Sequence, residues 1–290
     1  MSRPKPPAWY DAQYDARAGI PEQAAIRQSW VERSQQTRAT LPCQLDLAYG
    51  PHPSERLDIF GTGRSPASEQ GAPVLIYIHG GYWRALDKRD QSFVAEPFVA
   101  AGTLVVVPNY ALAPVVSVRH IVLQMVQAVA WVHRHIAEHG GNPRRVVVAG
   151  HSAGGHLATM MLACRWSQVA PDLPTQVLHA ALSVSGIYEL EPLRHAPFLA
   201  KDLKLTAAEA QALSPACMPA PRQGQLISVA GADESSEFRR QNALIRQAWG
   251  ADKVAICETL PARHHMIVLH DLAAPGQRLH TLALGLLGLA

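Results

Sequence analysis

The sequence has few cysteines and little net charge. Its 290 residues contain four cysteines at widely separated positions, with no CxxC pair, so neither a zinc knuckle nor a disulfide scaffold is indicated. We expect buried free thiols at Cys43, Cys164, Cys217 and Cys257. The 26 Lys and Arg exceed the 23 Asp and Glu by only three, and the basic residues form no cluster. A nucleic-acid function is therefore not expected.

Long apolar runs are also missing. No stretch of 18 apolar residues occurs, because the longest candidate, 115–132, is interrupted by Arg119, His120, Gln124 and Gln127. The first residues carry charge with no apolar segment behind it, unlike a secretory signal. With 48% hydrophobic and 17% charged residues, the composition is that of a globular protein. We expect a cytoplasmic protein with a small-molecule substrate and no membrane partner, and leave a homodimer open.

Apolar segments rich in β-branched residues predict strands buried on both faces of a parallel sheet. They lie at 74–78, 103–107, 145–149, 180–184, 225–229 and 253–259. Helical patterns alternate with them, the clearest being an apolar stripe over 118–136 with spacings of four and three. Two shorter alternating strands, 44–49 and 56–60, come first. The order predicts an α/β fold whose mostly parallel sheet has helices on both faces.

The chain divides into an arm and one main domain. We expect 1–42 to be an N-terminal arm packed on the domain 43–290, with a helix over about 21–38 that contacts the domain through Ile26, Trp30 and Val31. The segment 187–222 is rich in Pro and Ala and is the one long irregular insertion. It is expected to form a small cap or a pocket wall.

A serine lies where a strand turns into a helix. Residues 150–154 read Gly-His-Ser-Ala-Gly and match G-x-S-x-G, the turn that exposes a nucleophilic serine. The strand 145–149 precedes the match and a helix over 153–164 follows it. The flanking glycines allow the sharp bend without Cβ clashes. Ser152 is thus the candidate nucleophile, and a glycine-rich turn with an exposed serine is the alternative.

A serine nucleophile needs a histidine base that a carboxylate holds in place. In this architecture the partners follow in the order serine, acid, histidine. His264 and His265 come after the last predicted strand, so one of them is the expected base. Asp233 and Glu234 follow the strand 225–229, and each is a candidate for the acid. Either could instead cap the helix that begins near Glu237.

Two glycines follow the first buried strand, within Ile-His-Gly-Gly-Tyr-Trp at 78–83. They let backbone N–H groups point at a developing oxyanion. The expected oxyanion hole combines the N–H groups of Gly80, Gly81 and Tyr82 with that of Ala153, and a plain glycine turn is the alternative. Tyr82 and Trp83 are expected either to wall an aromatic leaving group or to pack in the core.

Together these residues resemble the α/β-hydrolase superfamily, and its kynurenine formamidase (arylformamidase) branch more closely than its lipases. His-Gly-Gly-Tyr-Trp at 79–83 is similar to the HGGxW motif of that branch, and 150–156 and 185–190 are similar to its elbow and to the segment after the next strand. The segment 234–241 resembles its acid-containing segment, which places the acid on Glu234. Met266 departs from the phenylalanine that usually follows the catalytic histidine, here His265.

The resemblance covers about 44–275 and implies hydrolysis of N-formyl-L-kynurenine to formate and L-kynurenine in tryptophan breakdown. It implies that Ser152 attacks the formyl carbon, that His265 takes the serine proton and that Glu234 orients His265. No metal or organic cofactor is needed. A carboxylesterase or arylesterase of broad specificity for short acyl esters is the alternative. A non-catalytic binding protein of the same fold is a third hypothesis, which the intact set of residues disfavours.

Overall fold

The centre of the molecule is an eight-stranded sheet. The computed structural model describes residues 5–63 and 71–290, so the first four residues of the predicted arm lie outside it. The strand order is β1-β2-β4-β3-β5-β6-β7-β8, in which β2 pairs antiparallel with β1 and β4 and the other pairs are parallel. The strands are β1 (Cys43–Ala48), β2 (Arg56–Phe60), β3 (Ala72–Ile78), β4 (Leu104–Pro108), β5 (Gly141–His151), β6 (Ala180–Val184), β7 (Gln225–Gly231) and β8 (Ile256–Leu260). The predicted mostly parallel sheet is confirmed.

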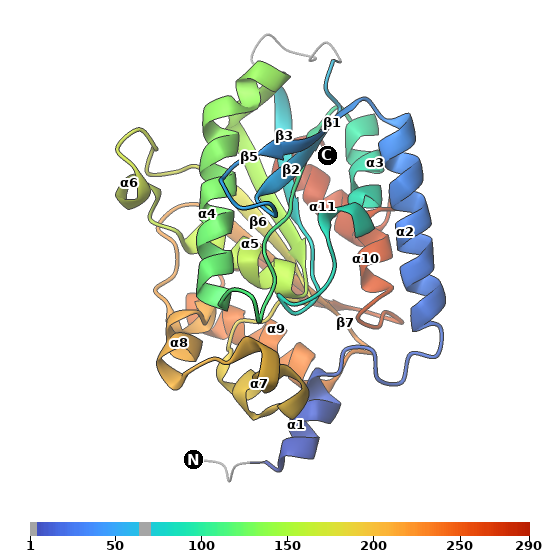
Figure 1. Ribbon diagram of the computed structural model, residues 1–290, viewed down its shortest axis with the longest axis vertical. Coiled ribbons are helices and arrows are strands. Elements are labelled where there is room, and N and C mark those ends of the chain that lie inside the picture. The colour runs from blue at the N-terminus through green and yellow to red at the C-terminus, as the bar shows by residue number, and fades with distance from the viewer. Residues whose placement is uncertain (1–4, 64–70) are drawn as a thin grey trace.

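Helices cover both faces of this sheet, which is why every residue of β4 and β6 is buried. Figure 1 shows α4 (Val118–His135) and α5 (Ala153–Ala163) on one side, and α3 (Ala95–Ala100), α10 (Val268–Leu272) and α11 (Arg278–Leu287) on the other. Two apolar clusters correspond to these two layers. Three further helices are α6 (Trp166–Val169), α8 (Ala207–Ala212) and α9 (Ser236–Trp249). The helical stripe of α4 faces inward as predicted.

The N-terminal segment forms two helices where one was predicted. The predicted helix is α2 (Gln23–Thr40), with Ile26 and Trp30 buried and Val31 half-buried. The unforeseen α1 (Pro7–Tyr14) begins with a proline at its first position, which suits a helix N-terminus. It packs against α9 and α7 (Pro197–Leu203), and the Tyr14 hydroxyl donates to Glu237 Oε2 at 2.8 Å. Residues 191–217 are largely short helical turns.

The cysteines are less buried than predicted. Cys217 is exposed, and Cys43, Cys164 and Cys257 are half-buried. Cys43 and Cys257 lie in β1 and β8, the two edge strands, which have a neighbour on one side only. Cys164 follows the last residue of α5. Within residues 5–63 and 71–290, no helix combines the length and apolar character needed to cross a bilayer.

Candidate active site

Ser152 occupies a strained turn between β5 and α5. Its φ of 57° and ψ of −119° are unusual for a residue with a side chain, and its N–H donates to the Val184 carbonyl of β6 at 2.8 Å. A Cβ on Gly150 would lie 2.1 Å from the Gly154 oxygen, and one on Gly154 would lie 2.0 Å from the Ile78 oxygen. Only glycine fits at both positions. The turn therefore holds Ser152 at the carboxyl ends of the parallel strands.

The structure brings His265 and Glu234 together. His265 Nδ1 lies 2.6 Å from Glu234 Oε2, and the Glu234 side chain is fully buried. The other carboxylate oxygen accepts hydrogen bonds from Ser185 Oγ and from the Gly231 N–H, both at 2.5 Å. A carboxylate so held makes His265 Nδ1 the protonated nitrogen and leaves Nε2 as the one that can accept a proton.

The structure distinguishes the two candidates for the acid, Asp233 and Glu234, and the two for the base, His264 and His265. Asp233 is exposed, whereas His264 pairs with Glu22 across 3.2 Å and also accepts from the Met266 N–H. Neither acidic candidate caps α9, because the side chain of Ser235 accepts from the Phe238 N–H instead. Among the four candidates, only Glu234 and His265 form a hydrogen-bonded pair.

His151 supports the loop that carries His265. Its Nε2 lies 2.8 Å from the His265 carbonyl oxygen, and the two imidazole rings are 4.7 Å apart. Burial holds the pKa of His151 well below its usual value, so this ring stays neutral and donates from Nε2. On the other side, the Phe238 ring is 4.5 Å from that of His265. These contacts fix where His265 lies.

The loop after β3 provides backbone donors beside Ser152. Gly81 and Tyr82 have φ values of 102° and 51°, and a Cβ on Gly81 would lie 2.0 Å from a carbonyl oxygen of the same loop. A Cβ on Gly80 would lie 2.8 Å from the carbonyl oxygen of His151, so this loop lies directly against the serine turn. Ala153 is the first residue of α5, and its N–H has no acceptor within the helix. An oxyanion hole is built from backbone N–H groups of such segments beside the nucleophile, and these residues are its candidates here.

Tyr82 and Trp83 differ in their surroundings. Tyr82 lines the cavity above Ser152, and its hydroxyl donates to the Tyr14 carbonyl at 2.6 Å. Trp83 is fully buried, and its ring meets that of His156 edge-on at 5.0 Å. Trp83 does not line the cavity, so its predicted part in substrate binding is corrected to packing, because its ring is enclosed in the apolar core next to His156 of α5.

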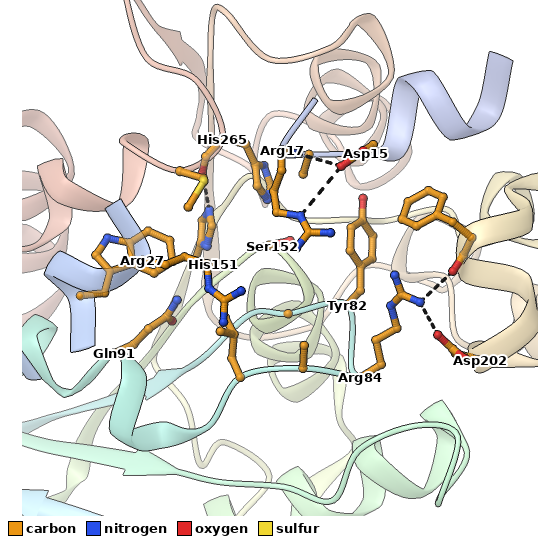
Figure 2. Close-up of a pocket in the computed structure, with 17 residues that line it drawn as sticks. Asp15, Arg17, Arg27, Tyr82, Arg84, Gln91, His151, Ser152, Asp202 and His265 are labelled. Atoms are coloured by element: carbon orange, nitrogen blue, oxygen red, sulfur yellow. Dashed lines mark hydrogen bonds and ion pairs between the residues drawn. The ribbon is translucent and has the colours of Figure 1, made fainter. Parts of the chain in front are cut away.

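A cavity of about 310 Å³ opens over Ser152 and His265. One side of it is the carboxyl edge, by which we mean Ser152, Glu234, His265 and the loop 79–83; of these residues, Gly81, Tyr82, Ser152 and His265 line the cavity. The opposite wall is the cap, by which we mean residues 7–40 and 187–222. Figure 2 shows the cap side chains of Arg17 and Arg27 reaching toward the carboxyl edge. The cap residues that line the cavity are Asp15, Ala16, Arg17, Arg27, Trp30, Phe198 and Asp202.

This geometry agrees with a comparison against known families. Residues 75–248 match the model of a family described as having the alpha/beta hydrolase fold. The chain belongs to the α/β-hydrolase family. Solved structures of similar shape share that fold. A candidate thioesterase from Silicibacter sp. TM1040 is 28% identical with a TM-score of 0.81, over 93% of this chain and 97% of that one. Esterase B from Lactobacillus rhamnosis is 17% identical with a TM-score of 0.69, over 92% and 94% of the two chains.

Relatives with curated names divide into two groups. The kynurenine formamidase of Danio rerio is 31% identical over 90% of this chain and 86% of its own length, and that of Salmo salar is 29% identical over 89% and 86%. The esterase LipQ of Mycobacterium tuberculosis is 34% identical over 50% of this chain and 35% of its own length. The α/β-hydrolase fold and a hydrolase activity, predicted from the sequence, are confirmed.

Several residues of this hydrolase site carried no recognisable signal. Ser185 lies in a segment that resembles the family, yet nothing local shows that its hydroxyl binds Glu234. Its φ of 51° places it in a sharp turn directly after β6. Arg27 and Gln91 line the cavity from distant parts of the chain. The alternation of strand and helix does not show which side chains such long-range packing brings together.

Proposed function

We propose that the protein is a kynurenine formamidase that hydrolyses N-formyl-L-kynurenine to formate and L-kynurenine. The observation that carries the proposal is a buried Glu234–His265 pair whose histidine lines the same cavity as Ser152, in a chain that matches kynurenine formamidases over about nine-tenths of its length. Ser152, His265 and Glu234 are the proposed nucleophile, base and acid. Gly80, Gly81, Tyr82 and Ala153 are the proposed oxyanion-hole residues.

In the first half of the reaction, Ser152 Oγ attacks the formyl carbon as its proton passes to His265 Nε2. Glu234 stabilises the imidazolium that forms, because its Oε2 accepts the Nδ1 proton across 2.6 Å. The carbonyl oxygen gains negative charge and is held by backbone N–H groups. The carbon–nitrogen bond then breaks, and His265 gives the proton to the arylamine nitrogen. L-kynurenine leaves, and a formyl ester remains on Ser152.

In the second half, water attacks the formyl carbon of this ester and His265 accepts its proton. The carbon–oxygen bond to Ser152 breaks, Ser152 regains a proton from His265, and formate leaves. Tyr82 lines the cavity and would contact the aromatic ring of the leaving group. The sum of the two steps consumes one water and regenerates the enzyme.

Ester hydrolysis is the second candidate function. The esterase LipQ matches half of the chain, and the same residues would cleave a short acyl ester by the same steps. The two candidates differ in the leaving group, which the cap contacts. A cytoplasmic location and a homodimer stay predictions from the sequence.

Parallel kinetics on N-formyl-L-kynurenine and p-nitrophenyl acetate test the proposal, with Ser152→Ala as the blank. We expect both substrates to be cleaved, with a higher kcat/KM for the formamide. An enzyme that cleaves p-nitrophenyl acetate but leaves N-formyl-L-kynurenine intact at millimolar concentration would be an esterase. If neither is cleaved, the proposal fails altogether.

A further inference from the structure

One corner of the cavity contains two hydrogen-bond donors, the exposed guanidinium of Arg27 and the buried amide nitrogen of Gln91. Arg27 of α2 and Gln91 both line the cavity. In the view of Figure 2 both side chains extend toward the region of His151, and the amide nitrogen of Gln91 is turned toward the side chain of Arg27. Within residues 5–63 and 71–290, Gln91 Nε2 is buried and has no hydrogen-bond partner. An unpaired buried donor is costly, so this corner suits a ligand that supplies an acceptor.

The orientation of the Gln91 amide has a clear cause. The buried Tyr77 hydroxyl donates to Gln91 Oε1 at 2.7 Å, which occupies the acceptor end of the amide. The donor end is left for the cavity. Gln91 itself is fully buried, so bulk solvent does not satisfy this group. The hydrogen bond to Tyr77 thus leaves the amide nitrogen as the end of Gln91 without a partner among the described residues.

Arg27 differs from the two other arginines of the cavity. Arg84 forms an ion pair with Asp202, and Arg17 lies 4.0 Å from a carboxylate oxygen of Asp15. Arg27 has no carboxylate partner among the described residues. The Arg and Asp residues that line the cavity therefore total three positive and two negative side chains, and the excess charge belongs to Arg27.

We propose that Arg27 and Gln91 form a subsite for a substrate carboxylate, on the leaving-group side of the scissile bond. A guanidinium binds a carboxylate through two parallel hydrogen bonds, and the Gln91 amide adds a third donor. The inference rests on the proposed function: the leaving group L-kynurenine is an amino acid, and its α-carboxylate would occupy this corner. The subsite selects carboxylate-bearing aryl leaving groups over neutral ones.

A pair of substrates that differ in the carboxylate alone tests the subsite. N-formyl-L-kynurenine is compared with N-formylkynuramine, which lacks the carboxylate, in the full-length wild type and in Arg27→Gln. We expect the ratio of the two kcat/KM values to fall about 10- to 100-fold in the variant, mainly through the KM of the carboxylate substrate. Equal losses on both substrates, or no loss, would overturn the subsite.

Two further variants separate this role from folding. Gln91→Glu keeps the acceptor for Tyr77 but places a carboxylate beside Arg27, and we expect it to reduce the same ratio. Arg144→Gln removes one positive charge from an exposed position before the buried part of β5 and should leave the ratio unchanged. An unchanged ratio in Gln91→Glu would exclude Gln91 from the subsite.

The two proposals fail in different ways. If wild type cleaves no formamide, the proposed function is wrong, and the subsite is then tested with phenyl acetate and 3-(3-acetoxyphenyl)propanoate. A fall in the carboxylate preference of Arg27→Gln on this ester pair would support the subsite in an esterase. An equal response to both esters would overturn it.

Discussion

The two walls of the cavity are built differently. At the carboxyl edge, the side chains of His265 and Glu234 are 9% and 0% exposed and each has a fixed hydrogen-bond partner. In the cap, the side chains of Arg17 and Asp15 are 53% and 45% exposed and their ion pair is long. The buried wall sets the reaction type, because its atoms must be placed within a few tenths of an ångström. In the proposed reaction the looser wall would contact the leaving group and would be where substrate preference can vary.

The largest effect is expected from the acid of the carboxyl edge. Glu234→Gln can keep the hydrogen bonds from Ser185 and Gly231, but its amide NH₂ would then face His265 Nδ1. That contact moves the ring proton to Nε2, so the imidazole can no longer accept the proton of Ser152. We expect kcat to fall on the order of 10⁴-fold.

Asp233→Asn is the matched control for this substitution. Asp233 is the preceding residue and is exposed, so its variant should stay within about twofold of wild type. The measurement is steady-state hydrolysis of N-formyl-L-kynurenine and of p-nitrophenyl acetate. A larger loss in Asp233→Asn than in Glu234→Gln would reassign the acid.

The next effect is expected from the loop after β3. In Gly81→Ala, the new Cβ overlaps a backbone oxygen at 2.0 Å, so the loop must shift and the adjacent N–H donors move with it. We expect kcat to fall about 10²- to 10³-fold. Gly102→Ala is the control, because Gly102 has a similar φ of 85° but open space around its Cβ. Equal kcat values for the two variants would mean that this loop supplies no N–H donors to the oxyanion hole.

His156 joins the two walls, and its protonation should affect stability. Its Nε2 lies 2.8 Å from the carbonyl oxygen of Leu213 in the cap, and burial lowers the pKa of His156 to about 4. Between pH 6.5 and 4, the unfolded chain therefore binds a proton that the folded protein does not, and stability falls as the pH falls. When the pH is lowered from about 7.5 to about 5, this histidine should reduce the free energy of unfolding by about 2 kcal/mol.

Urea unfolding of wild type and His156→Gln at the two pH values measures this contribution. The glutamine side chain has no proton to gain, so the variant should lose about 2 kcal/mol less than wild type over the same interval. Equal losses in the two proteins would mean that His156 does not titrate in this range.

The smallest effect is expected where the cap meets the loop. Tyr82→Phe removes the hydrogen bond to the Tyr14 carbonyl but keeps the ring and the backbone, so we expect KM to rise about 3- to 10-fold with little change in kcat. Tyr10→Phe is the control on the same helix as Tyr14, since the Tyr10 hydroxyl makes no hydrogen bond within the described part of the chain. A lower kcat with an unchanged KM would contradict this expectation and indicate that the Tyr82 hydroxyl contacts the reacting atoms.

The sequence predicts the carboxyl edge better than the cap, for physical reasons. Strands such as 180–184 and the turn around Ser152 are specified by neighbouring residues, through β-branched runs and glycines that only a sharp bend requires. The sequence pattern alone does not decide whether Asp233 or Glu234 is the acid, because the choice depends on the direction in which one side chain points. The family resemblance, and not periodicity, favoured Glu234.

The cap depends on contacts between distant segments. α1 is eight residues long and lies next to α9, more than 200 residues later in the chain, so no local pattern shows where it packs. Arg27 and Gln91, 64 residues apart in the sequence, line the same cavity for the same reason. Even for adjacent residues the sequence does not predict which side chain faces the cavity. Tyr82 lines the cavity, whereas Trp83 packs in the core.

In the proposed reaction Ser152 is a nucleophile activated by His265. Labelling of the purified protein with a fluorophosphonate, followed by peptide mass mapping, tests this assignment, with Ser152→Ala and His265→Ala as controls. We expect one adduct, on Ser152, that forms rapidly in wild type, is absent in Ser152→Ala and is strongly slowed in His265→Ala. An adduct on another residue, or no adduct on wild type under conditions in which it hydrolyses its substrate, would contradict it.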